Sequence, residues 1–270
     1  MLALGLLGTG FLTACSTPDA AREPLILQGG PAKASAAVPA RAQGLSPIEL
    51  AATLSHLDGA TRAPYRSHLV ASEGTSYLLQ PARSEVRIYA FREGAIGMRL
   101  GHNHVISVPQ FAGLAWAPAK GLRGGSADFS LRLSEIALDA PALRQETGGA
   151  FGTVLKDSDI KGTLDHLLGE QGFQAERFPV IAAKLVVETG EAPIAIADLA
   201  LSLHGETHHQ RIVMKVLADA QGIEAQGSFA FRQGDFGLKP YAMLGGLLAV
   251  DELVAVSFTL RGSALKAGQL

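Results

Sequence analysis

Five of the eight histidines lie close together in the sequence, in two groups whose spacing could serve to bind a metal ion or a polar ligand. His102 and His104 lie two positions apart, so in a β-strand both side chains leave the same face. His204, His208 and His209 form a second group. Two imidazoles on one strand with a third from a neighbour would suit Zn²⁺ or Cu²⁺. The pair could equally hydrogen-bond the polar head of a lipid or serve only the structure, and the sequence leaves all three interpretations open.

Cys15 is the only cysteine, which excludes an internal disulfide and a cysteine-based metal cluster. Residues 1–14 are apolar but too few to span a bilayer, as in a secretory signal peptide. Leu12-Thr13-Ala14-Cys15 resembles the lipobox of bacterial lipoproteins, in which the cysteine is diacylated, although no lysine or arginine precedes the apolar run. The resemblance implies a lipid-anchored periplasmic protein of a Gram-negative bacterium, and Ser16 in place of aspartate favours the outer membrane.

The region between this signal and the first predicted strand is typical of a tether. Residues 16–44 are rich in Ala, Pro, Gly and Ser without periodicity. Ser46-Pro47-Ile48-Glu49 has the form of a capping box and predicts a short helix over residues 47–57 that ends near Gly59. We therefore assign residues 15–76 to a lipidated N-terminus, a tether and a short helix.

From Tyr77 onward the sequence has the alternating pattern of apolar residues that is typical of β-strands. Leu199, Leu201 and Leu203 recur at every second position, Gly205-Glu206-Thr207 breaks the run, and a second extended run follows, which predicts a β-hairpin. Further strands are expected at residues 85–91, 111–116, 127–138, 180–188, 223–232 and 253–261.

One stretch of this region has helical spacing instead. Ile160, Leu164 and Leu167 recur at the period of a helix, and they predict a helix over residues 157–168 with Asp157 or Ser158 as its cap. With no alternation of strands and helices along the chain, we expect an all-β fold, an eight-stranded antiparallel lipocalin-like barrel with one helix inserted mid-chain.

Composition and the absence of known motifs exclude several classes of function. The formal net charge is −2 and no basic block stands out, so nucleic acid is not an expected partner. The chain has no P-loop, no dinucleotide fingerprint, no metalloprotease helix and no nucleophile elbow. These absences favour a binding protein over an enzyme, and we expect neither a cofactor nor a resident metal.

Residues 77–262 resemble the YceI-like, polyisoprenoid-binding family, with a C-terminal tail over residues 263–270. The landmarks, in order, are Tyr77-Leu78-Leu79-Gln80-Pro81, Ser84-Glu85-Val86, the run from Phe173 to Pro179, the hairpin from Asp198 to Thr207, Asp235-Phe236-Gly237-Leu238 and Asp251-Glu252-Leu253-Val254. Residues 100–106 look like a branch of the family with a Gly-His-x-His signature, and Arg83 stands where many members carry histidine. The resemblance implies an elongated barrel that encloses an isoprenoid chain, with the helix 157–168 near its mouth.

We therefore expect non-enzymatic binding or carriage of an isoprenoid-type lipid, polyprenyl or quinone-like, in the cell envelope. The residues expected to contact this ligand are His102, His104, Phe91, Leu201, His204 and Phe236. Two alternatives stay open: a metal- or redox-linked accessory protein that uses the histidines, and a structural envelope protein whose barrel is filled by its own side chains. Which face of the strand at residues 199–203 points inward, that of Leu201 or that of Ala200, is also open, as is homodimer formation.

Overall fold

The computed structural model describes residues 59–71, 73–266 and 269. The chain divides into two units, Met1–Arg41 and Ala42–Leu270, and the described residues all belong to the second. The signal peptide, Cys15, the tether and the helix predicted over residues 47–57 lie outside the described residues. None of the helices in the described part of the chain is long and apolar enough to cross a membrane.

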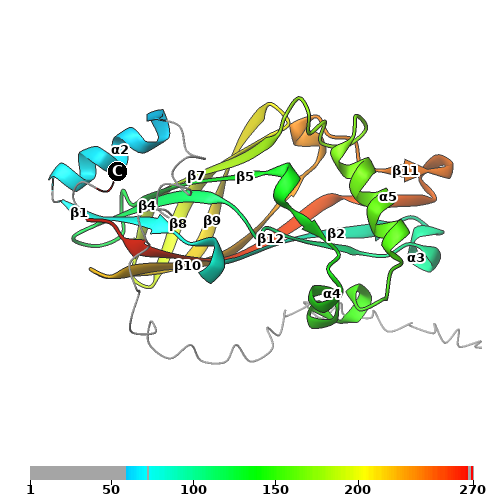
Figure 1. The fold of residues 1–270 in the computed structure, drawn as a ribbon, viewed down its shortest axis with the longest axis horizontal. Helices are drawn as coiled ribbons and strands as arrows, with labels where there is room; N and C mark the ends of the chain where they lie inside the picture. Colours follow the sequence, from blue (N-terminus) through cyan, green and yellow to red (C-terminus); the bar gives the residue numbers. More distant parts are fainter. Residues whose placement is uncertain (1–58, 72, 267–268, 270) are drawn as a thin grey trace, which may run out of the picture. The chain divides into compact units, whose positions relative to one another are not determined.

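The described residues form one antiparallel sheet of twelve strands (Figure 1). The strands are β1 Gly74–Leu79, β2 Glu85–Glu93, β3 His104–Ser107, β4 Ala112–Pro118, β5 Ser126–Arg132, β6 Ala137–Leu138, β7 Val180–Glu191, β8 Ile194–Leu203, β9 Glu206–Ala218, β10 Gly222–Arg232, β11 Ala242–Met243 and β12 Leu248–Ala264. The helices are α2 Gly59–Ala71, α3 Gly97–Leu100, α4 Pro141–Thr147 and α5 Asp157–Leu168.

The sheet closes into a barrel of eight walls. Breaks in the chain divide three walls into the pairs β1 with β2, β3 with β4, and β5 with β6, and β11 is a short addition that pairs with β12. The long strand β12 pairs with β10 on one side and with β2 and β1 on the other, which completes the ring. The predicted all-β fold, a closed eight-stranded antiparallel barrel, is confirmed.

The turn of the β8–β9 hairpin is shorter than the break that the sequence analysis predicted at Gly205-Glu206-Thr207. Leu203 pairs with Glu206, so the turn consists of His204 and Gly205 alone. Both have positive φ, 52° and 86°, the conformation of the two-residue turns whose twist matches paired strands. Because glycine adopts this conformation without strain, Gly205 sets the place of the turn. Thr207 therefore belongs to β9 and not to a loop.

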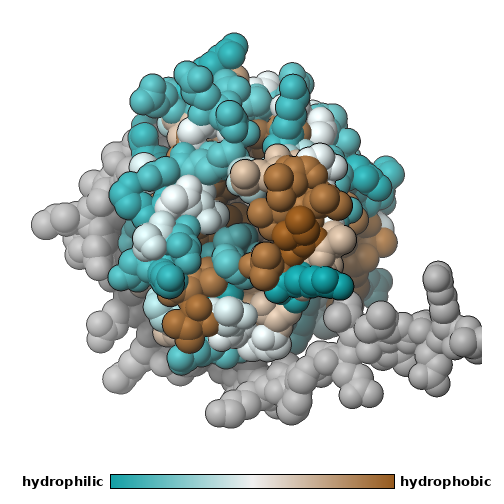
Figure 2. All heavy atoms as spheres, turned by 90° about the vertical axis from the view of Figure 1, so that its right-hand side faces the viewer, coloured by the Kyte–Doolittle hydropathy of each residue, from teal (hydrophilic) through white to brown (hydrophobic). Residues whose placement is uncertain are grey.

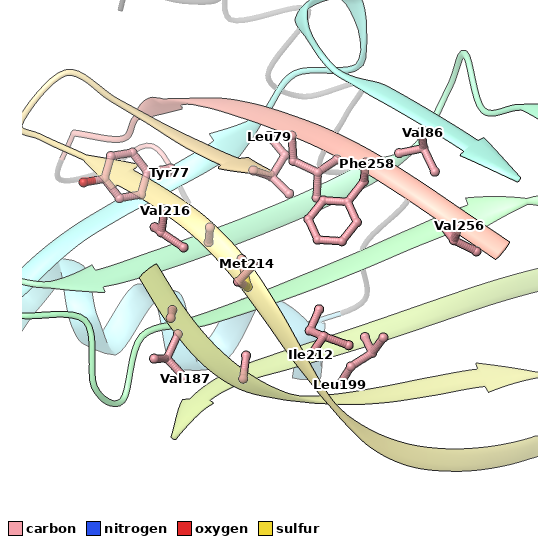
Figure 3. Packing of buried hydrophobic residues seen from close by; sticks show 14 of the residues in the cluster. Tyr77, Leu79, Val86, Val187, Leu199, Ile212, Met214, Val216, Val256 and Phe258 are labelled. Carbon is pink, nitrogen blue, oxygen red and sulfur yellow. The ribbon is translucent and has the colours of Figure 1, made fainter. Parts of the chain in front are cut away.

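One half of the barrel interior is filled by its own side chains. Tyr77 and Leu79 of β1 pack against Met214 and Val216 of β9, and Phe258 of β12 contributes to the same cluster (Figure 3). These positions alternate along their strands with outward residues, as the period of a strand requires. The packed half lies toward the end of the barrel where β9 passes into β10, away from α3 and α5.

A helix that the sequence analysis missed covers part of the outer wall. Tyr65 of α2 is buried with Leu78 of β1 and Leu114 of β4, which face outward from the barrel. The Tyr65 hydroxyl donates a hydrogen bond to Asp128 Oδ2 at 2.7 Å. Burial and the charge of Asp128 raise the pKa of Tyr65 far above its ordinary value. Pro64 lies inside α2, and because proline is unfavourable in a helix interior, the sequence does not indicate a helix here.

The helix predicted over residues 157–168 is confirmed as α5. Its cap differs from the expectation, because the N-cap residue is Lys156 and no side chain caps the first turn. Gly169 follows the helix as expected, and its N–H bonds the carbonyl oxygens of Asp165 and His166. In Figure 1, α5 lies at the same end of the barrel as α3 and β11.

Candidate functional site: an apolar cavity with a polar mouth

The half of the barrel near α5 holds a cavity of about 750 Å³. The inward faces of the barrel strands line it with apolar side chains, among them Val86, Ile88 and Ala90 of β2, Phe129 and Leu131 of β5, Ile181, Ala183 and Leu185 of β7, Leu199, Leu201 and Leu203 of β8, Phe229 and Phe231 of β10, and Val254, Val256, Phe258 and Leu260 of β12. Its volume falls within the range of about 300–1,000 Å³ typical of ligand pockets. The alternative of a barrel filled by its own side chains is therefore wrong for this half.

Small residues keep the cavity open. Ala127 of β5 and Ala183 of β7 face the lumen next to the larger Leu185 and Phe129. Trp116, the only tryptophan, does not line the cavity and packs beside α2 instead. A barrel of this size has room for an apolar ligand only where such small side chains leave the volume unfilled.

Polar side chains come from one end of the cavity only. Arg92 is near the end of β2, Gln233 follows β10, and Lys239 precedes β11. At the same end, α5 presents Ser158, Asp159, Thr163 and His166 to the cavity. The cavity is thus an apolar pocket with a polar mouth, a form that suits a molecule with a long apolar part and one polar end.

His102 and His104 both line this mouth. Only His104 lies in a strand, because β3 begins there and His102 precedes it. Their rings meet edge to face with centroids 5.5 Å apart. His104 Nδ1 lies 2.5 Å from Asp139 Oδ2. Because a carboxylate only accepts, Nδ1–H is the donor, and Nε2 of His104 is the nitrogen that can meet a ligand.

Asp139 is the centre of a buried network behind the histidines. Its Oδ1 accepts hydrogen bonds from the backbone N–H of Val105 at 3.0 Å and from Arg144 Nη1 at 2.5 Å. Arg144 Nη1 also donates to the carbonyl oxygen of Asn103, and its Nε donates to that of Thr153. The network connects α4 to the segment that carries both histidines and fixes the ring of His104.

The pKa shifts follow from this arrangement. Burial alone would raise the pKa of Asp139, but hydrogen bonds from His104, from the Val105 N–H and from Arg144 outweigh it and lower the pKa below its ordinary value of 3.8. Burial lowers the pKa of His102 below 6.5, and the charges of His104 and Arg144 lower it further. His102 is therefore neutral at pH 7, and it can both donate and accept a hydrogen bond.

The other three histidines do not join this pair. His204 lies in the β8–β9 turn, where its Nδ1 donates to the carbonyl oxygen of Phe236 at 3.0 Å. His208 and His209 are neighbours in β9 and so point to opposite faces of the strand. Among the described residues, no group of three or more His, Cys, Asp and Glu side chains is placed to hold a metal ion. The metal interpretation therefore finds no ligand set in this part of the chain.

Three of the residues predicted to contact a ligand lie outside the cavity lining. Phe91 faces outward from β2, where Phe151 packs against it edge to face. Phe236 is buried in a cluster with Leu201 and Leu203 of the barrel wall. His204 borders a second hollow of about 620 Å³ beside the mouth. Leu201 lines the cavity, which resolves the question, left open by the sequence, of which face of β8 points inward.

The sequence analysis missed the partners of the histidines. Asp139 is 35 positions from His104 in the sequence, and Arg144 lies on a helix of seven residues. Neither belongs to a motif of recognisable spacing. Among the residues missed, Arg92 could have been found from the sequence. It continues the alternation of Val86, Ile88 and Ala90, which lie on the inward face of β2.

A closed antiparallel barrel with an apolar cavity that opens at one end is the architecture of the lipocalin-like binding proteins. Among known protein families, the profile described as the YceI-like domain matches residues 77–261. The chain therefore belongs to the YceI-like family, whose barrel is a binding-protein fold.

The chain is similar to solved structures of low sequence identity. BcnA of Burkholderia cenocepacia is 13% identical, with a TM-score of 0.50, and the match covers 68% of this chain and 98% of that one. The YceI protein of Campylobacter jejuni is 8% identical, with a TM-score of 0.45, and the match covers 60% and 85% of the two chains. A search of curated protein sequences found no match.

Proposed function

We propose that this protein binds one isoprenoid-type lipid, polyprenyl or quinone-like, without catalysing a reaction, and carries it in the bacterial cell envelope. The observation that carries the proposal is the cavity of about 750 Å³ with apolar walls and a polar mouth. Membership of the YceI-like family, known for polyisoprenoid-binding barrels, supports the choice of an isoprenoid tail.

The binding energy would come mainly from burial of the tail. Each Å² of apolar surface removed from water contributes about 25 cal/mol, so a tail that fills the cavity supplies most of the affinity. His102, His104 and Arg92 would meet the polar head, because they line the mouth and can hydrogen-bond it. Their contribution is orientation of the lipid, with the tail inward.

Filling the cavity should displace the lipid. In Ala183→Trp the indole would enter the lumen, whereas in Ala182→Trp, its neighbour on β7, the same side chain would lie on the outer face. We expect native purification, lipid extraction and mass spectrometry to find about equimolar lipid in the wild type and in Ala182→Trp, and at least about tenfold less in Ala183→Trp.

Both variants should keep the far-ultraviolet circular dichroism of the wild type. Wild-type protein that carries no apolar lipid and takes up neither a polyprenol nor a quinone offered to it would contradict the proposed function. Equal lipid content in two folded tryptophan variants would show that lipid binds outside the barrel.

The proposed place of action rests on Cys15, the only cysteine of the chain. We propose that the protein is acylated there and held at the outer membrane with its barrel in the periplasm. Cys15→Ala should remove the acceptor of the lipid and release the protein from the membrane fraction to the soluble periplasmic fraction. The measurement is fractionation with immunoblotting, and a variant that stays in the membrane fraction would contradict acylation at Cys15.

A further inference from the structure

Exposed apolar side chains gather beside the mouth of the cavity. They come from α3 and from residues 241–247, a segment made of β11 and the turn Leu244–Gly246, and we call them the apolar rim: Met98, Leu100, Tyr241, Met243, Leu244 and Leu247. Leu100 is 77% exposed and Leu244 is 65% exposed. Single exposed apolar residues are common, but a group around one opening marks a surface that meets an apolar partner.

The two segments of the apolar rim are held together by their backbones. The N–H groups of Ile96 and Gly97 both donate to the carbonyl oxygen of Leu247, at 2.8 and 2.9 Å. Gly94, with a φ of 83°, lies so close to the second segment that a Cβ atom would come within 2.4 Å of the Gly246 oxygen. Backbone hydrogen bonds and close packing therefore fix the two segments of the apolar rim relative to each other.

The apolar rim is continuous with the cavity. Leu100 and Tyr241 belong to the rim and also line the cavity, and Leu248 continues the lining from the rim into β12. Figure 2 looks onto this end of the barrel and shows apolar surface beside a hollow. A tail that leaves the cavity here would pass directly over apolar side chains.

The charges of the apolar rim indicate what kind of surface it meets. Within residues 94–101 and 239–247 the charged residues are Arg99 and Lys239, and neither segment contains a carboxylate. The nearest acidic residues in the sequence, Glu93, Asp235 and Asp251, lie beyond the two segments. At the mouth itself, α5 contributes one carboxylate to the cavity lining, that of Asp159. Apolar side chains with basic neighbours are the combination that binds the interface of an anionic bilayer.

We propose that the apolar rim docks onto the surface of an anionic phospholipid bilayer, with the mouth of the cavity against the membrane. Met98 and Leu244 enter the interfacial region, and Arg99 and Lys239 meet the phosphate groups of the lipids. The docking lets a tail pass between bilayer and cavity without crossing water. This last role rests on the proposed lipid cargo, whereas the docking itself does not.

The test uses the full chain with a fluorescent probe at a single position. Because Cys15 is the only native cysteine, Cys15→Ser allows one new cysteine to be labelled with a nitrobenzoxadiazole dye. The rim position is Leu244→Cys, and the matched control is Val213→Cys on the outer face of β9, where the native valine is 62% exposed. Both proteins are added to vesicles of phosphatidylcholine and phosphatidylglycerol at a ratio of about three to one.

We expect the emission at Leu244→Cys to shift to the blue and to be quenched by spin-labelled lipid, while the emission at Val213→Cys stays unchanged. Arg99→Glu should weaken the rim signal by about tenfold on these vesicles and much less on vesicles of phosphatidylcholine alone. Comparison of two positions in one chain separates docking from any attachment through the N-terminus, which affects both probes equally.

Three outcomes would overturn the proposal: a rim probe that stays in water on vesicle-bound protein, equal shifts at both positions, or a rim shift that depends on protein concentration without vesicles. The last would show a contact between two copies of the chain. Mass spectrometry of the lipid bound to the same samples keeps the two proposals apart. A docked rim on protein without cargo contradicts the proposed function alone, and cargo without docking contradicts this inference alone.

Discussion

Replacement of Asp139 by alanine is expected to lower the free energy of unfolding by about 3–5 kcal/mol, the cost of leaving one partner of a buried ion pair uncompensated. The Asp139 side chain is 0% exposed and that of Arg144 is 3% exposed, so water cannot replace the lost carboxylate. The Val105 N–H and His104 Nδ1 also lose their acceptor. The loss falls beside a short strand pairing, since β6 has only two residues and pairs with β3 through both.

Urea unfolding at pH 7 measures this loss, and the chain offers a matched control. Asp198 forms a similar pair with His209, at 2.8 Å, but on the surface, where the two side chains are 31% and 63% exposed. Asp198→Ala should cost less than about 1 kcal/mol, because exposed ion pairs contribute little. If the two alanine variants lose equal amounts of stability, the buried network does not hold the mouth of the barrel together.

The same carboxylate predicts how wild-type stability depends on pH. Its pKa is lower in the folded protein than its ordinary value of 3.8. A depressed pKa means that its stabilising contribution is fully present above the unfolded value and disappears as the pH falls through the folded value. The difference in stability between the wild type and Asp139→Ala should therefore shrink below about pH 4. A difference that stays constant down to pH 2 would assign the loss to packing and not to charge.

Local periodicity accounts for what the sequence predicted well. Leu199, Leu201 and Leu203 recur at every second position, and the structure places all three on the inward face of β8. The spacing of Ile160 and Leu164 likewise predicted α5 with the bounds that the structure has. In β8 the inward face is apolar, so the pattern in the sequence also gives the orientation of the strand. In α5 the pattern gives the helix alone, because Thr163 and His166 line the cavity whereas Ile160 and Leu164 do not.

The same reasoning failed where both faces of an element are apolar. In β2, Val86 and Ile88 point into the cavity, while Tyr89 and Phe91 are covered on the outside by Phe151. Because the outer cover comes from residues far along the chain, nothing within β2 distinguishes its two faces. The prediction that Phe91 contacts the ligand was an arbitrary choice between them.

The site itself depends on long-range contacts that no local pattern encodes. The position of His104 was visible as one of a pair, but its partner Asp139 follows a strand of two residues, and Arg144 lies on a short helix. Elements of this length fall below the window in which periodicity can be read. Asp139 also has a φ of 52°, a conformation that is uncommon outside glycine and that no apolar periodicity predicts.

Leu201→Arg is expected to abolish lipid binding while the barrel remains folded. Leu201 lines the cavity, pairs across the sheet with Ala183, and is only 6% exposed. A guanidinium at this position would occupy the space of the tail. An unpaired charge facing hydrocarbon costs several kcal/mol, which is a loss in affinity of at least about a hundredfold. Extraction and mass spectrometry of natively purified protein should find no bound isoprenoid in this variant.

The adjacent residue provides the control for this substitution. Ala200 points to the outer face of β8, between Lys184 of β7 and His209 of β9, where an arginine stays in water. Ala200→Arg should therefore bind as much lipid as the wild type, and thermal unfolding should show that both variants fold. Since the two substitutions differ only in the face of the strand, unequal binding would locate the lipid inside the barrel. A folded Leu201→Arg protein that retains wild-type lipid would place the ligand elsewhere and contradict the proposed function.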